Sequence, residues 1–319
     1  MAEETLEQVF SGSLHDLTGV VAVVTGGCSG IGMMISSTLL ANGATVFIID
    51  KREDLLDSVT KSYNAAAEKL GRQGGFIPLA GDISKKSEAK RLGEEVGKRV
   101  PYVTVLFNNA GISEGNFNKP KEAKASAFVT SFFDEIEEES FYRVLSVNAV
   151  APYWLTFAFL PLLEKWKEAG YGSEGRRFPP QVVMTSSMNG WTKDSDTSGR
   201  SYPYLFSKSA IGHATATLAR ELLPLGIRVN GIAPGLFISG MSVPGSTNEL
   251  GQSSCTDLSK FDFQVPTPQL PVELGGPKNV GGSFKDIASL ILFLVSNWYV
   301  NGETVLIDGG TLLVHASSY

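Results

Sequence analysis

Two side chains that could carry acid/base chemistry, Tyr204 and Lys208, are four residues apart in the chain. On a helix this spacing places both residues on one face. A phenol has an ordinary pKa of about 10, and an ammonium nearby favours the phenolate and lowers that pKa toward neutrality. The pair is therefore predicted to pass a proton to or from a reacting oxygen, although the same spacing also occurs by chance on many helices.

A glycine-rich turn, Thr25-Gly26-Gly27-Cys28-Ser29-Gly30-Ile31-Gly32, follows an apolar run and precedes a helical pattern. Glycines allow a tight backbone, and the free N–H groups of a helix N-terminus bind phosphate. Such turns also serve tight strand-to-helix packing, so the motif alone is weak. Its predicted contacts to a dinucleotide pyrophosphate are Gly26, Ser29, Gly30, Ile31 and Gly32.

An acidic residue, Asp50, ends the next apolar run, eighteen residues after Gly32. A carboxylate there can accept both hydroxyls of an adenosine ribose and would repel a 2′-phosphate, which slightly favours NAD(H). Lys51 and Arg52 follow at once and could bind that phosphate if Asp50 turned aside, so NADP(H) stays possible. The two cations could equally form a solvated helix start. Lys51 is kept with Asp50 among the predicted cofactor contacts.

These residues must be positioned by a framework, and short β-branched runs alternate with stretches of helical period along the chain. This rhythm predicts an α/β fold: one Rossmann-type, doubly wound parallel sheet of about seven strands with helices on both faces. The predicted strands are Val20–Val24, Thr45–Ile49, Phe76–Leu79, Val103–Phe107, Gln181–Thr185, Ile227–Ile232 and Thr304–Ile307. The predicted helices begin near Ile31, Glu53, Lys86, Phe141, Ser207 and Phe284.

The predicted organisation is an N-terminal extension, residues 1–16, and a single domain, residues 17–319. Residues 113–140, 168–180 and 240–282 do not fit the rhythm and are predicted to be insertions on loops. The first and last follow the fourth and sixth strands, where open α/β sheets bind ligands, so they are candidate substrate walls. Long loops also simply tolerate insertion. Four apolar side chains near these insertions predict an apolar substrate: Phe132, Phe133, Phe237 and Met241.

Further motifs follow the predicted strands in order: Gly81-Asp82-Ile83, Asn108-Asn109-Ala110-Gly111, Ser187, Tyr204 to Lys208, and Pro234-Gly235. With the glycine-rich turn, they make the chain resemble the short-chain dehydrogenase/reductase family from about Leu17 to Gly310. Within it, the stretch from Val229 to Phe237 resembles fungal members often labelled 3-oxoacyl carrier-protein reductases of the rhamnolipid type. The spacing from Ser187 to Tyr204 is a few residues longer than is common in the family.

The resemblance implies a catalytic set of Asn148, Ser187, Tyr204 and Lys208. Ser187 would hydrogen-bond the reacting oxygen, Lys208 would also hold the nicotinamide ribose, and Asn148 would position a water that links Lys208 to solvent. The resemblance further implies cofactor contacts at Asp82, Ile83, Asn109, Ala110, Gly111, Tyr204, Lys208, Pro234 and Gly235. It also implies a homodimer or homotetramer, formed through the helices near Phe141 and Ser207.

Charge and composition argue against several other classes of protein. A net charge of −6 and a pI near 5.3 argue against nucleic acid as a partner. Two cysteines and three histidines without a cluster predict neither a disulfide framework nor a metal site. The N-terminus lacks a signal-peptide pattern, and no apolar run reaches roughly 18 residues, so a cytoplasmic protein without a membrane span is expected.

The predicted function is that of an NAD(P)-dependent short-chain dehydrogenase/reductase acting on CH–OH or C=O groups. Its substrate is expected to be a small hydrophobic ketone or secondary alcohol of polyketide, terpenoid or acyl type. Two alternatives stay open: a redox-silent regulator that binds the cofactor, and an enzyme of the same fold that catalyses a non-redox biosynthetic step.

Overall fold

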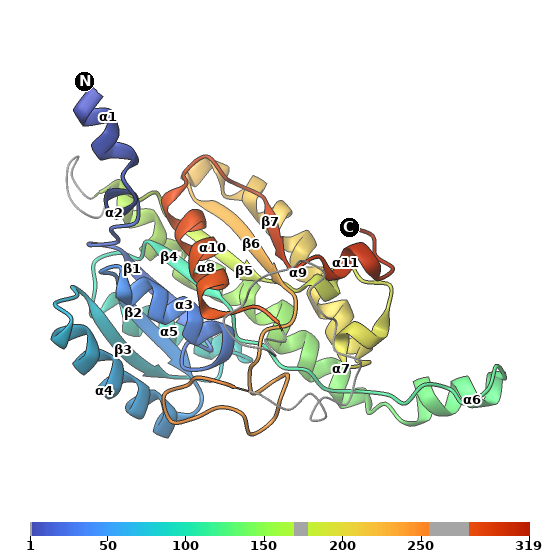
Figure 1. Cartoon of the computed structure of the whole chain (residues 1–319). Helices are drawn as coiled ribbons and strands as arrows, with labels where there is room; N and C mark the ends of the chain where they lie inside the picture. The colour runs from blue at the N-terminus through green and yellow to red at the C-terminus, as the bar shows by residue number, and fades with distance from the viewer. Residues whose placement is uncertain (1, 169–177, 255–280) are drawn as a thin grey trace.

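The computed structural model describes residues 2–168, 178–254 and 281–319, and its centre is one parallel sheet (Figure 1). The seven strands lie in the order β3-β2-β1-β4-β5-β6-β7. This confirms the predicted doubly wound sheet, and most predicted strand bounds differ from the observed ones by one or two residues. The strands are β1 (Val21–Thr25), β2 (Thr45–Asp50), β3 (Gly75–Ala80), β4 (Val105–Asn108), β5 (Gln181–Thr185), β6 (Arg228–Pro234) and β7 (Thr304–Ile307).

Helices cover both faces of the sheet because the strands are apolar on both sides. In β1, Ala22 and Val24 belong to the core that α3 and α10 cover, whereas Val21 and Val23 belong to the core that α5, α8 and α9 cover. The α-helices are α1 (Ala2–Val9), α2 (Ser11–Leu14), α3 (Gly30–Ala41), α4 (Glu53–Lys69), α5 (Lys86–Gly97), α6 (Ala125–Val129), α7 (Glu138–Leu145), α8 (Ala151–Glu164), α9 (Tyr202–Glu221), α10 (Phe284–Ser296) and α11 (Thr311–Val314). All six predicted helices are present, and the one expected near Ser207 begins earlier, at Tyr202.

One helical stretch, Glu138–Glu164, joins α7 and α8 through a single π-helical turn, η2 (Ser146–Val150). Among the described residues, this stretch is long and apolar enough to cross a membrane, with a mean hydropathy of 1.4. Its residues Leu155, Phe159 and Leu163 are fully buried in the core on one face of the sheet. Core helices of α/β proteins have the same composition, because one side of each packs on apolar strands.

The insertion at residues 113–140 is not a plain loop, which corrects the prediction. It contains α6 and a π-helical turn, η1 (Thr130–Asp134), and extends away from the sheet (Figure 1). Phe132 packs there against Phe117 and Tyr202, with ring centroids 4.7 and 5.7 Å away. These aromatic contacts hold the segment against the start of α9. They join residues that are distant in the chain, so the local sequence pattern does not indicate them.

Two other predicted insertions lie partly outside the described residues. Of residues 240–282, the structure describes 240–254 and 281–282; of residues 168–180, it describes 168 and 178–180. Residues 2–16 form the two short helices α1 and α2, which lie at the edge of the molecule and contain no buried residue (Figure 1). The division into an extension and one domain stays a prediction.

Candidate active site

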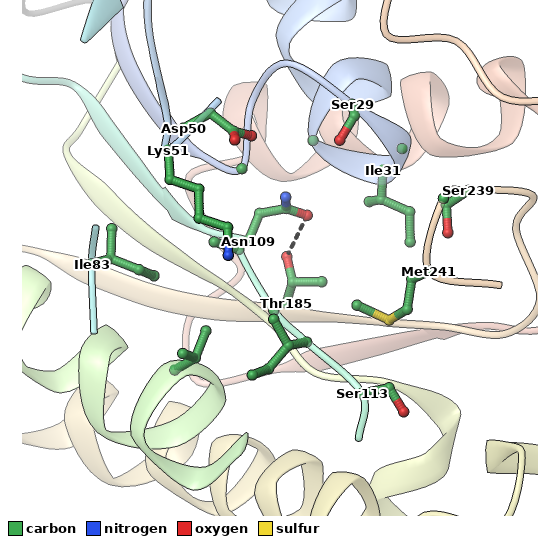
Figure 2. Close-up of a pocket in the computed structure, with 18 of the residues that line it drawn as sticks. Ser29, Ile31, Asp50, Lys51, Ile83, Asn109, Ser113, Thr185, Ser239 and Met241 are labelled. Atoms are coloured by element: carbon green, nitrogen blue, oxygen red, sulfur yellow. Dashed lines mark hydrogen bonds between the residues drawn. The ribbon is translucent and has the colours of Figure 1, made fainter. Parts of the chain in front are cut away.

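A cavity of about 780 Å³ opens at the carboxyl ends of the central strands. All of the predicted site residues line it except Asn148, which lies directly behind the wall. Figure 2 shows Asp50 and Lys51 toward one end and Ser113 and Met241 toward the other. The predicted residues on the wall are Gly26, Ser29, Gly30, Ile31, Gly32, Asp50, Lys51, Asp82, Ile83, Asn109, Ala110, Gly111, Ser187, Tyr204, Lys208, Pro234 and Gly235.

The glycine-rich turn links β1 to α3 at one side of the cavity. Gly26 has φ of +63°, and a Cβ at Gly32 would lie 2.0 Å from the carbonyl oxygen of Gly26, so neither position accepts a side chain. Ser29 directly precedes α3 at the N-cap position, and its hydroxyl does not cap the helix. The first N–H groups of α3 are therefore available to an anion, and the helix dipole favours one.

The threonine that begins the turn, Thr25, joins it to the neighbouring strand β4. Its Oγ1 donates to the carbonyl of Phe107 and accepts from the amides of Asn109 and Ala110, at 3.2, 3.0 and 3.1 Å. Asn109 also donates through Nδ2 to the carbonyl of Thr25, at 3.0 Å. These bonds fix the two backbone segments that form the cavity floor.

At the far end of the cavity, Asp50 is bound by Arg52 through two parallel hydrogen bonds. Arg52 Nε and Nη2 each donate to one carboxylate oxygen at 2.9 Å, and Nη2 also donates to Ser29 Oγ at 2.7 Å. Burial raises the pKa of Asp50, but the bonds from Arg52 and Cys28 outweigh it, and the pKa is lowered from 3.8. Asp50 is thus a buried carboxylate whose charge Arg52 neutralises.

Asp82 and Ile83 follow β3 and line the same half of the cavity. Ile83 is buried, whereas Asp82 is exposed at the rim. A hydrogen bond with Ser84 is the main cause that lowers the pKa of Asp82, so this carboxylate is also ionised at neutral pH.

Ser187 and Tyr204 meet in the other half of the cavity. Ser187 Oγ accepts from the amide of Asn189 at 3.1 Å and lies 3.3 Å from the carbonyl oxygen of Pro234. Burial raises the pKa of Tyr204, and its hydrogen bond with Ser187 lowers it by less, so the net pKa lies above 10.0. This direction is opposite to the lowering expected from the sequence, because burial of the phenol disfavours its anion.

Lys208 lies one turn after Tyr204 on α9 and is almost fully buried, with 4% of its surface exposed. Its Nζ donates to the carbonyl of Thr185 at 2.8 Å and lies 5.6 Å from the centroid of the Tyr204 ring. Burial lowers the pKa of Lys208 to about 8. The ammonium therefore carries its charge into the cavity at neutral pH.

Asn148 lies in the π-helical turn η2 and is buried. Its Oδ1 accepts from the amide of Ile112, and its Nδ2 donates to the carbonyl of Ile112 and to Ser207 Oγ, at 2.9, 2.9 and 3.0 Å. A Cβ at Gly111 would lie 3.2 Å from Asn148 Oδ1 and 3.6 Å from Lys208 Nζ. Asn148 thus fixes the segment that separates it from the cavity, and π-helical turns of this kind are frequent at functional sites.

Several wall residues were not predicted as site residues. The largest group comes from the segments after β4 and β6, where only the insertions themselves gave a signal: Ile112, Ser113, Glu114, Ser239, Gly240, Pro244, Gly245 and Thr247. Phe237, expected near the substrate, is instead buried in the core beside Gly282, and Phe133 is exposed. Of the four apolar side chains singled out, Met241 lines the cavity.

Comparison with known proteins agrees with this geometry. The short chain dehydrogenase family profile matches residues 20–249. "Short-chain dehydrogenase/reductase PhomF" of Diaporthe leptostromiformis is 31% identical, and the alignment covers 100% of both chains. "3-hydroxyacyl-CoA dehydrogenase type-2" of Homo sapiens is 30% identical over 92% of this chain and 96% of its own.

Among solved structures, the "Pseudomonas aeruginosa RhlG/NADP active-site complex" superposes with a TM-score of 0.67 at 26% identity. The superposition covers 93% of this chain and 98% of that chain. A family match over most of the length and full-length relatives above 30% identity agree with the seven-stranded sheet and its cavity. The chain therefore belongs to the short-chain dehydrogenase/reductase family.

Proposed function

We propose that the chain transfers a hydride between a nicotinamide cofactor and a ketone or secondary alcohol, with Tyr204 as the acid/base. One observation carries the proposal: the N-terminus of α3 and the Ser187, Tyr204 and Lys208 side chains line one cavity. Membership of an oxidoreductase family supports it. A nicotinamide dinucleotide supplies or accepts the hydride when bound.

The residues of the chain would handle the proton and the orientation. Tyr204 would donate its phenolic proton to the carbonyl oxygen of a ketone as the hydride reaches the carbonyl carbon. Ser187 would hydrogen-bond that oxygen and orient it. Because burial raises the pKa of Tyr204, the phenol is protonated at neutral pH and can act as the acid when a ketone is reduced. The charge of Lys208 would stabilise the phenolate left after proton transfer.

The wall of the cavity also fits the cofactor. The first turn of α3 offers N–H groups to a pyrophosphate, and Asp50 lies where β2 ends, as in dinucleotide-binding sheets. The cavity wall between the Asp50 end and Tyr204 also includes Asn109 to Gly111 and Pro234 to Gly235. Lys208 would hold the nicotinamide ribose at that point.

The choice between NAD(H) and NADP(H) is proposed to depend on the pair Asp50 and Arg52. Asp50 favours free ribose hydroxyls, while Arg52, which already spans to Ser29, supplies a cation for a 2′-phosphate. The NADP complex of the Pseudomonas relative supports a place for NADP(H) beside NAD(H). We therefore expect both cofactors to bind. Asp50 is expected to favour NAD(H), and Arg52 is expected to favour NADP(H).

Opposite single substitutions test this pair. Asp50→Ala frees Arg52 and is expected to raise the NADPH-to-NADH affinity ratio by about tenfold or more, the effect of one charge-assisted hydrogen bond. Arg52→Ala leaves a buried carboxylate without its partner and is expected to lower the same ratio by a similar factor. Fluorescence titration of each variant with both reduced cofactors gives the ratio. Equal ratios in the two variants and the wild type would contradict the proposed role of the pair.

A hydrophobic carbonyl compound of polyketide, terpenoid or acyl type is the proposed substrate. Ile112, Val147 and Met241 supply apolar surface to the same cavity that Tyr204 lines. The human relative named as a 3-hydroxyacyl-CoA dehydrogenase supports an acyl-type substrate. Apolar surface around a few polar groups is the usual composition of a small-molecule site.

A substrate panel tests this class. We expect medium-chain 3-oxoacyl thioesters and cyclic aromatic ketones to be reduced with kcat/KM at least tenfold above that for small polar sugars, since each methylene buried adds about 0.8 kcal/mol. Loss of nicotinamide fluorescence follows the reaction. Turnover confined to small polar sugars would contradict the proposal that the substrate is hydrophobic. Product formation without oxidation of the cofactor would instead favour a non-redox step, and cofactor binding without any product would favour a regulator.

Self-association and a cytoplasmic location are also proposed. Tyr142 of α7, Tyr153 of α8 and Phe206 of α9 are large apolar side chains with about half of their surface or more exposed, at 60%, 47% and 55%. Exposed apolar surface of this kind is typical of protein interfaces. The family resemblance supports the proposal that an interface between copies of the chain lies on these same helices.

A further inference from the structure

The segment between Ser187 and Tyr204, longer than is common in the family, forms a compact unit next to the site. It contains two 3₁₀ turns, η5 (Met188–Gly190) and η6 (Ser195–Ser198). Asn189 in the first and Thr197 in the second are buried, with 8% and 5% of their surfaces exposed. Buried polar side chains are costly unless they are paired, so their partners define what the segment does.

Asn189 and Thr197 pair with each other. The shortest contact of Thr197 Oγ1 is to Asn189 Oδ1 at 2.7 Å, and the carbonyl of Asp194 lies 2.9 Å and Thr192 Oγ1 3.2 Å from the same hydroxyl. Asn189 Nδ2 donates to the backbone carbonyl of Thr197 at 3.3 Å. The backbone amide of the same Asn189 donates to Ser187 Oγ at 3.1 Å. The Asn189–Thr197 pair therefore holds the backbone amide of Asn189 in place, and this amide is the donor that positions the Ser187 hydroxyl.

The C-terminal segment contacts the unit through an isolated β-bridge between Thr192 and Ser317. The Thr197 amide donates to the carbonyl of Asp194 at 3.2 Å, and Asp194 Oδ2 lies 2.8 Å from His315 Nδ1. The amide of Lys193 donates to the carbonyl of Ala316 at 2.6 Å. A continuous series of contacts thus runs from His315, through Asp194, Thr197 and Asn189, to Ser187.

We propose that Thr197 and Asn189 are positioning residues for Ser187, and that His315 supports them from the C-terminal segment through Asp194. This inference rests on the proposed function, because Ser187 needs a fixed orientation only if it binds the reacting oxygen. The extra length between Ser187 and Tyr204 then has a role: it supplies Thr197, the side chain that locks Asn189. Small displacements of a group that orients a substrate lower the rate far more than the binding of the cofactor.

Substitutions at Thr197 test the proposal in the full-length enzyme with saturating cofactor. Thr197→Val keeps the shape and removes the hydroxyl, and kcat is expected to fall about tenfold, with the Kd of the reduced cofactor changed less than twofold. Thr197→Ser restores the hydroxyl and should recover kcat to within about twofold of wild type. Thr215→Val is the matched control, because Thr215 is fully buried on α9 and its hydroxyl bonds the carbonyl of Ile211.

The pH profile supplies a readout that loss of structure alone would not move. Since the hydrogen bond with Ser187 lowers the pKa of Tyr204, a displaced Ser187 should shift the basic limb of kcat to higher pH in Thr197→Val. In the C-terminal segment, His315→Ala should shift kcat in the same direction as Thr197→Val, while His315→Asn, which keeps a donor, should restore it. These two variants keep the test intact if Thr197→Val does not fold.

The outcomes separate the two proposals. If the wild type reduces a ketone and Thr197→Val matches Thr215→Val in kcat and pH profile, the positioning role is overturned while the proposed function stands. Equal losses in Thr197→Ser and Thr197→Val would also overturn it, since the hydroxyl would not matter. If the wild type reduces no carbonyl compound although it binds the cofactor, the proposed function fails, and the positioning role fails with it.

Discussion

Replacing Tyr204 with phenylalanine is expected to lower kcat for ketone reduction by about 10²- to 10⁴-fold, the usual contribution of a positioned general acid. Phenylalanine keeps the ring and removes the hydroxyl that meets Ser187 in the cavity. The Kd of the reduced cofactor should change less than about threefold, because one neutral hydrogen bond contributes little to a large ligand. Steady-state turnover and cofactor fluorescence give both quantities from one preparation.

The control for this change is Tyr202→Phe, two residues earlier on the same helix. Tyr202 stacks on Phe117 with ring centroids 5.2 Å apart, so the variant keeps its packing and loses a hydroxyl outside the cavity wall. We expect kcat within about twofold of wild type. A Tyr204→Phe enzyme that kept half of the wild-type kcat would remove Tyr204 from the mechanism.

Replacing Lys208 with methionine is expected to stop turnover and, at the same time, to stabilise the fold at neutral pH. Burial lowers the pKa of Lys208 from 10.5 to about 8, which corresponds to a folding penalty of about 3 kcal/mol for the charged form. Methionine fills a similar volume without charge but loses the bond from the charged ammonium to the carbonyl of Thr185, worth about 2 kcal/mol. The net gain at pH 7 is about 1 kcal/mol in the free energy of unfolding.

The sign of the pH dependence follows from the lowered pKa. Between pH 8 and 10.5 the unfolded chain binds a proton at Lys208 that the folded chain has lost, so the wild type gains stability as pH rises through this window. The advantage of Lys208→Met is therefore full below about pH 8 and shrinks above it. Urea unfolding at pH 7 and pH 9.5 measures the difference. The exposed Lys90→Met variant is the control and should show no such pH dependence.

A less stable Lys208→Met enzyme at pH 7, or a stability difference that did not change with pH, would contradict the buried-charge account. Retention of turnover would contradict the mechanism instead, because Lys208 carries the cation of the site.

Most of the fold could be predicted because its strands are buried on both faces. Continuous apolar runs such as Val21–Thr25 identify such strands without tertiary information. The exception at residues 113–140 has a physical cause, because Phe117, Phe132 and Tyr202 come from distant positions in the chain and pack together. The local sequence pattern therefore does not predict the helical turns in this segment. The strand β4 begins two residues later than predicted, and just before it the Thr104 hydroxyl, rather than a backbone carbonyl, accepts from the amide of Val21.

The residues of the candidate site could be predicted from their types and their order in the chain. Their burial and their hydrogen-bond partners could not. The motifs identified the residues on the cavity wall, but the raised pKa of Tyr204 depends on burial, which a sequence does not display. The hydrogen bonds between Arg52 and Asp50 likewise arise from side-chain geometry after β2. Phe237 was expected beside the substrate and is instead in the core, because a single apolar residue after a strand can face either side of the chain.

Hydride transfer itself can be measured directly with a reduced cofactor that carries deuterium at C4 of the nicotinamide ring, in each of its two stereochemical forms. Incubation with the best ketone of the substrate panel, followed by mass spectrometry of the product, reports where the label goes. The account predicts an alcohol that carries one deuterium on the former carbonyl carbon from one form of the cofactor, and none from the other. A product without deuterium from either form would contradict hydride transfer as the function of this chain.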